Sequence, residues 1–170
     1  MADLENAAWV LAAVIATCRV AARGSLADPN RTAVLEAAGL ARRGLTVADR
    51  HAIEVDFTRE GGYAAARTVA GSEGLELVFA VSDVMAIGLM SGLRDAGLVP
   101  GRDLAVAGFD DIAAAVDVVP ALTSVAVALH DLGRRALSTA LGDAPATVVT
   151  IPADVVLRES TPATRPYTRH

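Results

Sequence analysis

The chain has 170 residues, of which 53% are hydrophobic, and a formal net charge of −5 at pH 7. A chain of this length and composition can bury one substantial core, so a single α/β or α domain is expected. The acidic balance argues against nucleic-acid binding through the chain's own phosphate contacts. All 15 basic residues are arginine, which excludes a Schiff-base lysine, a P-loop lysine and a Ser-Lys dyad from this sequence.

Cysteine usage and the apolar stretches bear on the compartment. Cys18 is the only cysteine, so an intramolecular disulfide and a cysteine-based metal cluster are both excluded, in keeping with a reducing cytoplasm. The longest apolar stretch, Ala7–Cys18, is shorter than the roughly 20 residues of a membrane-spanning helix. Because acidic rather than basic residues precede it, an export signal is also disfavoured. We therefore expect a cytoplasmic protein without membrane contact.

The first third of the chain predicts two helices around a short strand. Acidic and capping residues at the front of an almost continuous apolar segment favour a helix over Ala2–Thr17. Cys18–Ala22 is a candidate strand. The apolar residues within Arg31–Arg43 have helical spacing, and Gly44 follows as a helix-ending glycine.

The central part of the chain alternates strongly between strand and helix patterns. Short apolar runs indicate buried strands, and the segments between them end at glycine or proline. The expected elements are a strand over Ile53–Phe57, a helix over Gly61–Val69, a strand over Leu77–Val81, a helix over Val84–Ala96 and a strand over Leu104–Gly108. Thr58 or the residues that follow it are expected to open the first of these helices.

The last third continues the pattern and ends in a tail. We expect a strand over Leu122–Val127, a helix over His130–Leu141, short strands over Thr147–Ile151 and Val155–Leu157, and a frayed tail from Thr161. Strands that alternate with helices predict an α/β fold, with a parallel sheet covered by helices on both faces.

Polar and aromatic residues gather where the predicted strands end, which is where ligands bind in such sheets. These residues are Phe57, Ser82, Asp83, Asp110 and Asp111. Carboxylates accept hydrogen bonds from sugar hydroxyls or ring N–H groups, and an aromatic ring covers an apolar ligand face. A structural role is equally compatible with the pattern: helix capping for Asp83, a loop hydrogen bond for Asp111 and core packing for Phe57.

The same carboxylates open an enzymatic alternative. Asp83, Asp110 and Asp111 offer three oxygen ligands to a divalent metal in a hydrolase. However, the three histidines are scattered and no glycine-rich phosphate loop precedes a helix. Ligand binding without turnover fits the residues better, so we predict no catalytic residue, no metal and no cofactor.

The predicted helix over Val84–Ala96 is apolar around more than half of its circumference. One face must pack on the sheet, and the other needs a second partner. That partner is either another subunit or another helix of the same chain, and the sequence leaves both possibilities open.

Four segments together resemble the LacI-type family of bacterial transcription regulators, in the effector-binding portion. Val78–Ile112 resembles that family's strand-helix-strand signature. Pro120–Val125 followed by Leu132–Leu137 resembles its next strand and helix, and Val155–Ser160 resembles its terminal strand. Members of the family are similar to periplasmic sugar-binding proteins, in which two α/β subdomains clasp a small effector, and they carry a helix-turn-helix that reads operator DNA.

The resemblance implies a domain division and a set of contact residues. Residues 1–160 would form part of the effector-binding and dimerisation domain, with 128–145 returning to the other subdomain, 161–170 as a tail, and no helix-turn-helix pattern in this sequence. The ligand-binding residues that it implies are Phe57, Ser82 and Asp110, to which the strand-end position adds Asp83. The dimer contacts that it implies are Ile87 and Val118, to which the apolar helix over Val84–Ala96 adds Met85 and Met90.

The function implied is non-enzymatic sensing of a sugar or similar small metabolite by a homodimer. The effector would favour one arrangement of two subdomains, and this preference would reach DNA only through a helix-turn-helix domain. A periplasmic sugar-binding protein of a transport system shares the fold and is the alternative from another class.

Overall fold

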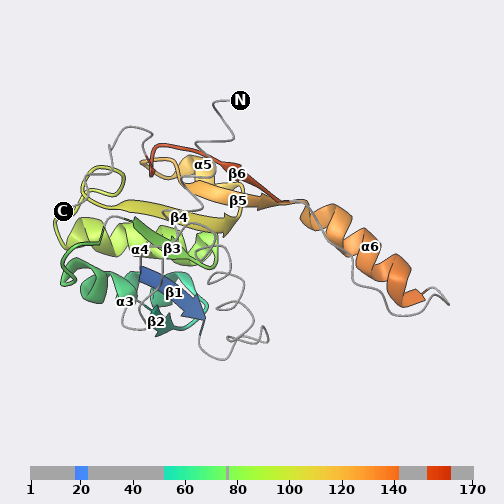
Figure 1. Cartoon of the computed structure of the whole chain (residues 1–170), viewed down its shortest axis with the longest axis horizontal. Helices are drawn as coiled ribbons and strands as arrows, with labels where there is room; N and C mark the ends of the chain where they lie inside the picture. The colour runs from blue at the N-terminus through green and yellow to red at the C-terminus, as the bar shows by residue number, and fades with distance from the viewer. Residues whose placement is uncertain (1–17, 23–51, 76, 142–152, 162–170) are drawn as a thin grey trace, which may run out of the picture.

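The computed structural model describes residues 18–22, 52–75, 77–141 and 153–161, which form one sheet with helices (Figure 1). The sheet has six strands in the order β2-β1-β3-β4-β5-β6. The strands are β1 Cys18–Ala22, β2 Ala52–Val55, β3 Leu77–Ala80, β4 Ala105–Asp110, β5 Thr123–Val127 and β6 Ala153–Val156. The predicted boundaries of β1 are confirmed, and the other predicted strands in the described ranges are found with shifts of one to a few residues.

The direction of the last strand corrects the expectation of a wholly parallel sheet. β1 to β5 pair in parallel with their neighbours, whereas β6 pairs antiparallel with β5. Antiparallel edge strands are common on otherwise parallel sheets. The α/β class is confirmed, with a mostly parallel sheet.

Four helices lie in the described ranges: α3 Arg59–Ala70, α4 Asp83–Asp95, α5 Ala114–Asp117 and α6 Leu129–Leu141. α3 starts two residues before the predicted helix because Thr58 caps it, its hydroxyl accepting from the Gly61 N–H at 2.9 Å. The short α5 was not predicted. The helices expected over Ala2–Thr17 and Arg31–Arg43 and the strand over Thr147–Ile151 lie outside the described residues.

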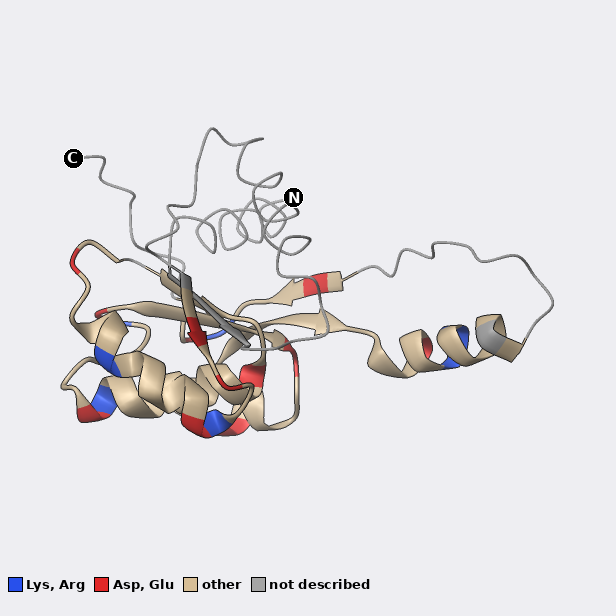
Figure 2. Cartoon of the chain, turned by 90° about the horizontal axis from the view of Figure 1, so that it is seen from below, with Lys and Arg blue, Asp and Glu red and all other residues tan. Residues whose placement is uncertain are grey.

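The core lies between the sheet and the layer formed by α3 and α4, which lies on one side of the sheet (Figure 2). Met85, Leu89, Met90 and Leu93 of α4 are fully buried there. α3 packs so closely on α4 that a Cβ on Gly62 would lie 2.0 Å from the Met85 carbonyl oxygen. Glycine at this position therefore allows the two helices to pack closely. Besides the sheet, α4 thus packs against a helix of the same chain.

α6 has a different place from the other helices. Figures 1 and 2 both show it extending away from the sheet, and each of its described side chains is exposed. Of the helices in the described ranges, none is long and apolar enough to cross a membrane.

Candidate functional site

The carboxyl edge of the parallel strands brings most of the predicted site residues to one side of the sheet. Phe57 follows β2, Ser82 follows β3, and Asp110 is the last residue of β4. β3 and β4 are neighbours, so Ser82 and Asp110 lie close together, and the Ser82 side chain hydrogen-bonds to Asp110. The prediction that these positions share one edge agrees with the strand order.

Phe57 lies at the same edge but farther along it. Its side chain is 56% exposed, so the core-packing alternative for Phe57 is wrong. β1 lies between β2 and β3, which separates Phe57 from Ser82 by two strand spacings, or about 10 Å. A ligand that contacts both Phe57 and Asp110 must therefore lie across the strand ends.

Ser82, and not Asp83, is the N-cap of α4. The Ser82 hydroxyl accepts from the Val84 N–H at 3.3 Å, whereas the Asp83 carboxylate bonds to groups outside the helix. The expectation that Asp83 caps this helix is therefore wrong. Ser82 is 2% exposed and Asp83 is 0% exposed, so of the four predicted ligand-binding residues only Phe57 and Asp110 have side chains open to a ligand.

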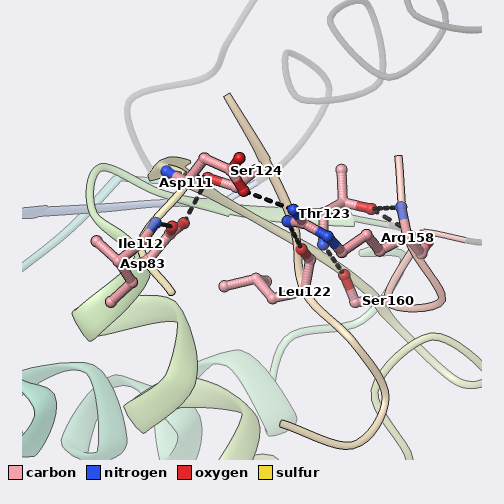
Figure 3. Close-up of polar contacts among 8 residues, drawn as sticks. All are labelled: Asp83, Asp111, Ile112, Leu122, Thr123, Ser124, Arg158 and Ser160. Atoms are coloured by element: carbon pink, nitrogen blue, oxygen red, sulfur yellow. Dashed lines mark hydrogen bonds and ion pairs between the residues drawn. The ribbon is translucent and has the colours of Figure 1, made fainter. Parts of the chain in front are cut away.

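Asp83 holds the loop that follows β4. One carboxylate oxygen, Oδ1, accepts from the Ser124 hydroxyl at 2.6 Å, and the other, Oδ2, accepts from the Ile112 N–H at 2.9 Å (Figure 3). A Cβ on Gly108 would lie 2.2 Å from Asp83 Oδ1. The glycine in β4 is thus what lets the carboxylate reach between the helix and the sheet.

Burial raises the pKa of the Asp83 and Asp110 carboxyls. Burial raises the pKa of Asp83, while the bonds from Ser124 and Ile112 oppose the rise and the nearby Asp110 and Asp111 add to it. Burial also raises the pKa of Asp110, and the hydrogen bond from Ser82 opposes that rise. Asp110 is therefore partly exposed and already accepts one hydrogen bond, from Ser82.

Asp111, unlike Asp83, pairs with an arginine. Its Oδ1 lies 2.7 Å from Arg158 Nη2, an ion pair without hydrogen-bond geometry, so this buried oxygen has no hydrogen-bond donor. The Asp111 backbone N–H donates to the Ser124 hydroxyl at 3.0 Å. The loop is therefore fixed through its backbone and its side chain.

The three neighbouring carboxylates do not form a metal-ligand set. Asp83 accepts from Ser124 and Ile112, and Asp111 pairs with Arg158. Within the residues that the structure describes, no group of three or more His, Cys, Asp or Glu side chains could hold a metal ion. The contacts give the metal-dependent hydrolase alternative no support.

The predicted dimer contacts divide into two kinds. Met85 and Met90 are 0% exposed and belong to the chain's own core, so the expectation that they contact a partner subunit is not supported by their place. Ile87 and Val118 are partly exposed and pack against the edge of that core. Ile87 and Val118 therefore remain the dimer prediction.

Several residues that organise this edge were not predicted. Ser124, Arg158 and Ser160 form buried or nearly buried contacts that join β4, β5 and the segment after β6. The sequence carried one signal for them, because Thr123 and Ser124 interrupt an otherwise apolar strand, and buried polar side chains need partners.

Comparisons with known proteins agree with this geometry. Residues 12–161 match the family described as "Periplasmic binding protein-like domain". The chain is 34% identical over 99 residues to catabolite control protein A of Priestia megaterium, covering 58% of this chain and 30% of that protein. It is 35% identical over 102 residues to the ribose operon repressor of Escherichia coli K12, covering 59% of this chain and 31% of the repressor.

A solved structure of a LacI-family transcriptional regulator from Enterococcus faecium with bound ribose has a TM-score of 0.72 and 21% identity. That comparison covers 94% of this chain and 62% of the solved chain. The curated matches thus span about a third of their relatives' length, and the shared fold spans less than two thirds of the solved regulator.

Proposed function

Because the chain belongs to the periplasmic binding protein-like domain family, in the form carried by LacI-type transcription regulators, we propose that it senses a small effector. The effector class is a sugar or a similar polyhydroxylated metabolite. The named relatives are transcription regulators rather than transport proteins, which favours sensing for gene control over periplasmic transport. The role is non-enzymatic and cytoplasmic.

The observation that carries the proposal is that an exposed aromatic ring and a partly exposed carboxylate follow two strands at the same sheet edge, three strand spacings apart, or about 14 Å. Asp110 is partly exposed at the end of β4, and Phe57 is 56% exposed after β2. A carboxylate accepts hydrogen bonds from adjacent hydroxyls, and an aromatic face covers the C–H surface of a sugar ring. Ser82 and Asp83 act beneath them, since both are buried.

Residues 1–160 then form one part of the effector-binding and dimerisation domain, and residues 128–145 reach toward a second subdomain. The exposed Leu129, Leu132 and Leu137 of α6 are the side chains expected on such a segment. Effector binding to one arrangement of the two subdomains would shift their population, and a helix-turn-helix domain would pass that shift to DNA.

A homodimer is part of the proposal, through the apolar surface around Ile87 and Val118. Ile87, Ser91 and Arg94 share one stripe of α4, and Arg94 Nη1 donates to the carbonyl oxygen of Val119 at 2.5 Å. The segment after α5 therefore lies beside this stripe. Val116 and Val119 add apolar surface there, at 57% and 78% exposure.

Sedimentation of the Ile87→Asp variant tests the dimer. The expected result is a fall from dimer to monomer mass, because a charge in an apolar interface loses its solvation without gaining a partner. Ser91→Asp places the same charge one turn away on the same stripe. Comparing the masses of the two variants shows whether the effect depends on position 87. An unchanged mass for Ile87→Asp would remove this interface from the proposal.

Calorimetric titration with a panel of aldopentoses, aldohexoses and disaccharides tests effector binding. One wall of a cleft gives few contacts, so we expect a dissociation constant of about 1 mM or weaker for a cognate sugar. Asp110→Ala and Phe57→Leu should each weaken that binding about tenfold. Asp117→Ala, on the exposed side of α5, should leave it unchanged.

A ligand present at about 100 times its dissociation constant stabilises the folded protein by about 2.7 kcal/mol. If no sugar at that concentration gave either binding heat or thermal stabilisation, the proposal would be contradicted. A second measurement concerns DNA. We expect the isolated chain to give no sequence-specific, salt-sensitive gel shift, and observing one would overturn the assignment of DNA contact to another domain.

A further inference from the structure

The loop that carries the proposed effector contact has a backbone that needs support. Asp110 has φ 106° and Asp111 has φ 53°, values in the region that glycine adopts freely and other residues adopt at a cost. Aspartate tolerates this region better than most residues, yet two such positions in succession are both strained. The contacts around the loop must therefore hold it in place.

Three contacts hold the loop, and they come from three different parts of the chain. Asp83 of α4 accepts from the Ile112 N–H at 2.9 Å. Ser124 of β5 accepts from the Asp111 N–H at 3.0 Å. Arg158, which follows β6, pairs with the Asp111 carboxylate at 2.7 Å (Figure 3).

Arg158 is itself rigidly placed. Its side chain is 14% exposed, and its Nη1 donates to the Leu122 carbonyl oxygen at 2.7 Å. Its backbone N–H donates to the Thr123 hydroxyl at 2.8 Å, and that hydroxyl donates to the Arg158 carbonyl oxygen at 3.1 Å. The guanidinium fork thus spans a carbonyl and a carboxylate, which a lysine ammonium does not match.

Neighbouring contacts extend this support to the centre of the sheet. The Ser160 hydroxyl accepts from the Thr123 N–H at 2.8 Å and donates to the Val106 carbonyl oxygen at 2.6 Å. The Val106 N–H in turn donates to the Ser160 carbonyl oxygen at 3.0 Å. The segment that carries Arg158 is therefore attached to β4 and β5 by several bonds besides the ion pair.

The Asp111 carboxylate depends on Arg158 more than on any other described group. Its Oδ1 is buried without a hydrogen-bond donor, so the guanidinium charge is what compensates that oxygen. The Asp111 side chain is 24% exposed, but its Oδ1 is not, and a buried charged oxygen left without its countercharge is unfavourable. Without Arg158 we expect the loop to move so that this oxygen reaches water, and Asp110 to move with it.

We propose that Arg158 is a positioning residue that sets the orientation of Asp110 at the effector-facing edge by neutralising Asp111. The proposal rests on the proposed function for the claim that Asp110 contacts the effector. It also connects that edge with the last described segment of the chain, because Arg158 lies two residues after the end of β6.

Amide hydrogen exchange of the full chain tests the positioning role without any ligand. In Arg158→Met, the Ile112 amide should exchange about tenfold faster or more, the ratio expected for loss of a charge-assisted contact. Core amides such as Leu89 should change far less. Arg134→Met removes an exposed arginine from α6 and is the matched control, with no expected change at Ile112.

A rescue separates positioning from a general loss of structure. The double variant Arg158→Met with Asp111→Asn removes the uncompensated charge while keeping a side chain that tolerates positive φ. Its Ile112 exchange should return toward the wild-type rate. Wild-type exchange in Arg158→Met, or failure of the double variant to restore slow exchange, would overturn the proposal.

Titration with D-ribose as the probe distinguishes the two proposals. If ribose shifts the Asp110 resonances of the wild type but not those of Arg158→Met, both proposals are supported. If ribose and the other sugars leave the wild type unchanged while exchange and rescue behave as described, effector binding fails and the positioning role stands. If ribose binds Arg158→Met as it binds the wild type, the positioning role fails.

Discussion

α4 and α6 are helices of 13 residues each, yet α4 is packed within the fold and α6 is not. α4 buries Met85, Leu89, Met90 and Leu93 completely, whereas all described side chains of α6 are exposed. A Cβ on Gly88 of α4 would lie 1.9 Å from the Arg59 carbonyl oxygen, while a Cβ on Gly133 of α6 would meet no atom within 4 Å. Both helices carry a glycine among their apolar residues. Within the described residues, only the glycine of α4 lies at a close contact with another helix.

The difference shows what an amphipathic pattern does and does not say. Apolar residues at helical spacing require a packing partner, but they do not state whether that partner is in the same chain. In α4 the partner is α3 and the sheet. α6 has an apolar stripe that includes Leu129, Leu132 and Leu137. No helix or strand of the described residues covers this stripe (Figures 1 and 2).

The largest expected effect comes from Gly88→Ala. The new methyl group would collide with the backbone of α3, and backbone cannot move aside as a flexible side chain does, so we expect a loss of about 3 kcal/mol or more. Urea unfolding followed by fluorescence or circular dichroism measures it. Stability equal to the wild type would mean that α3 and α4 are not in close contact.

Asp83→Ala should have the next largest effect, because α4 begins with a buried carboxylate that serves two partners. The substitution leaves the Ile112 N–H and the Ser124 hydroxyl without their acceptor, which costs about 2–4 kcal/mol. Asp117→Ala, which removes an exposed carboxylate from α5, is the control, with an expected loss below about 0.5 kcal/mol. Equal losses for the two variants would contradict the role given to Asp83.

Gly133→Ala should act in the opposite direction to Gly88→Ala. Alanine in an exposed helix interior is favoured over glycine by about 1 kcal/mol, and a Cβ there meets no neighbour. We expect higher helicity by circular dichroism and slower amide exchange in α6. Loss of helicity would reveal a close contact on α6 and end the contrast with α4.

Asp110→Asn should have the smallest effect, at the loop beside the N-cap of α4. The folded-state pKa of Asp110 is raised, so its contribution to stability is full below its ordinary pKa and is lost as pH rises through the folded value. Asparagine does not ionise and tolerates positive φ. We expect a gain of a few tenths of a kcal/mol at neutral pH, after discounting for solvent screening.

The pH dependence of that gain in stability is its test. The difference between Asp110→Asn and the wild type should shrink as pH falls to about 3, where the wild-type carboxyl is protonated in both states. Chemical denaturation at several pH values measures the difference. A gain that stays constant over this range would come from backbone conformation alone and would contradict the role of burial.

Much of the fold follows from local patterns in the sequence. β1 matches its predicted range, and the strands β3 and β5 are each found within a residue of theirs. For β3 the signal is a continuous apolar run that ends at Ser82, whereas β1 contains Arg19 and β5 begins with polar residues. The antiparallel direction of β6 was not predictable, since its residues alternate no differently for either direction. α5 was missed because four residues give no helical period.

The site was predicted less completely, for physical reasons that particular residues show. Ser82 and Asp83 are adjacent and both are good N-caps, so the sequence alone did not choose between them. The choice depends on Ser124 and Ile112, which are far from Asp83 in sequence and draw its carboxylate away from the helix. The Arg158–Asp111 pair is likewise a non-local contact that only the folded sheet brings together.

The central claim is that the carboxyl edge around Asp110 and Phe57 receives a sugar-like effector. A chemical-shift map of the labelled chain during titration with D-ribose and the other sugars tests it most directly. The account predicts saturable shifts at Phe57, at Ser82 and in the loop from Asp110 to Ile112, with α6 unaffected. Shifts confined to other surfaces, or none with any sugar, would contradict it.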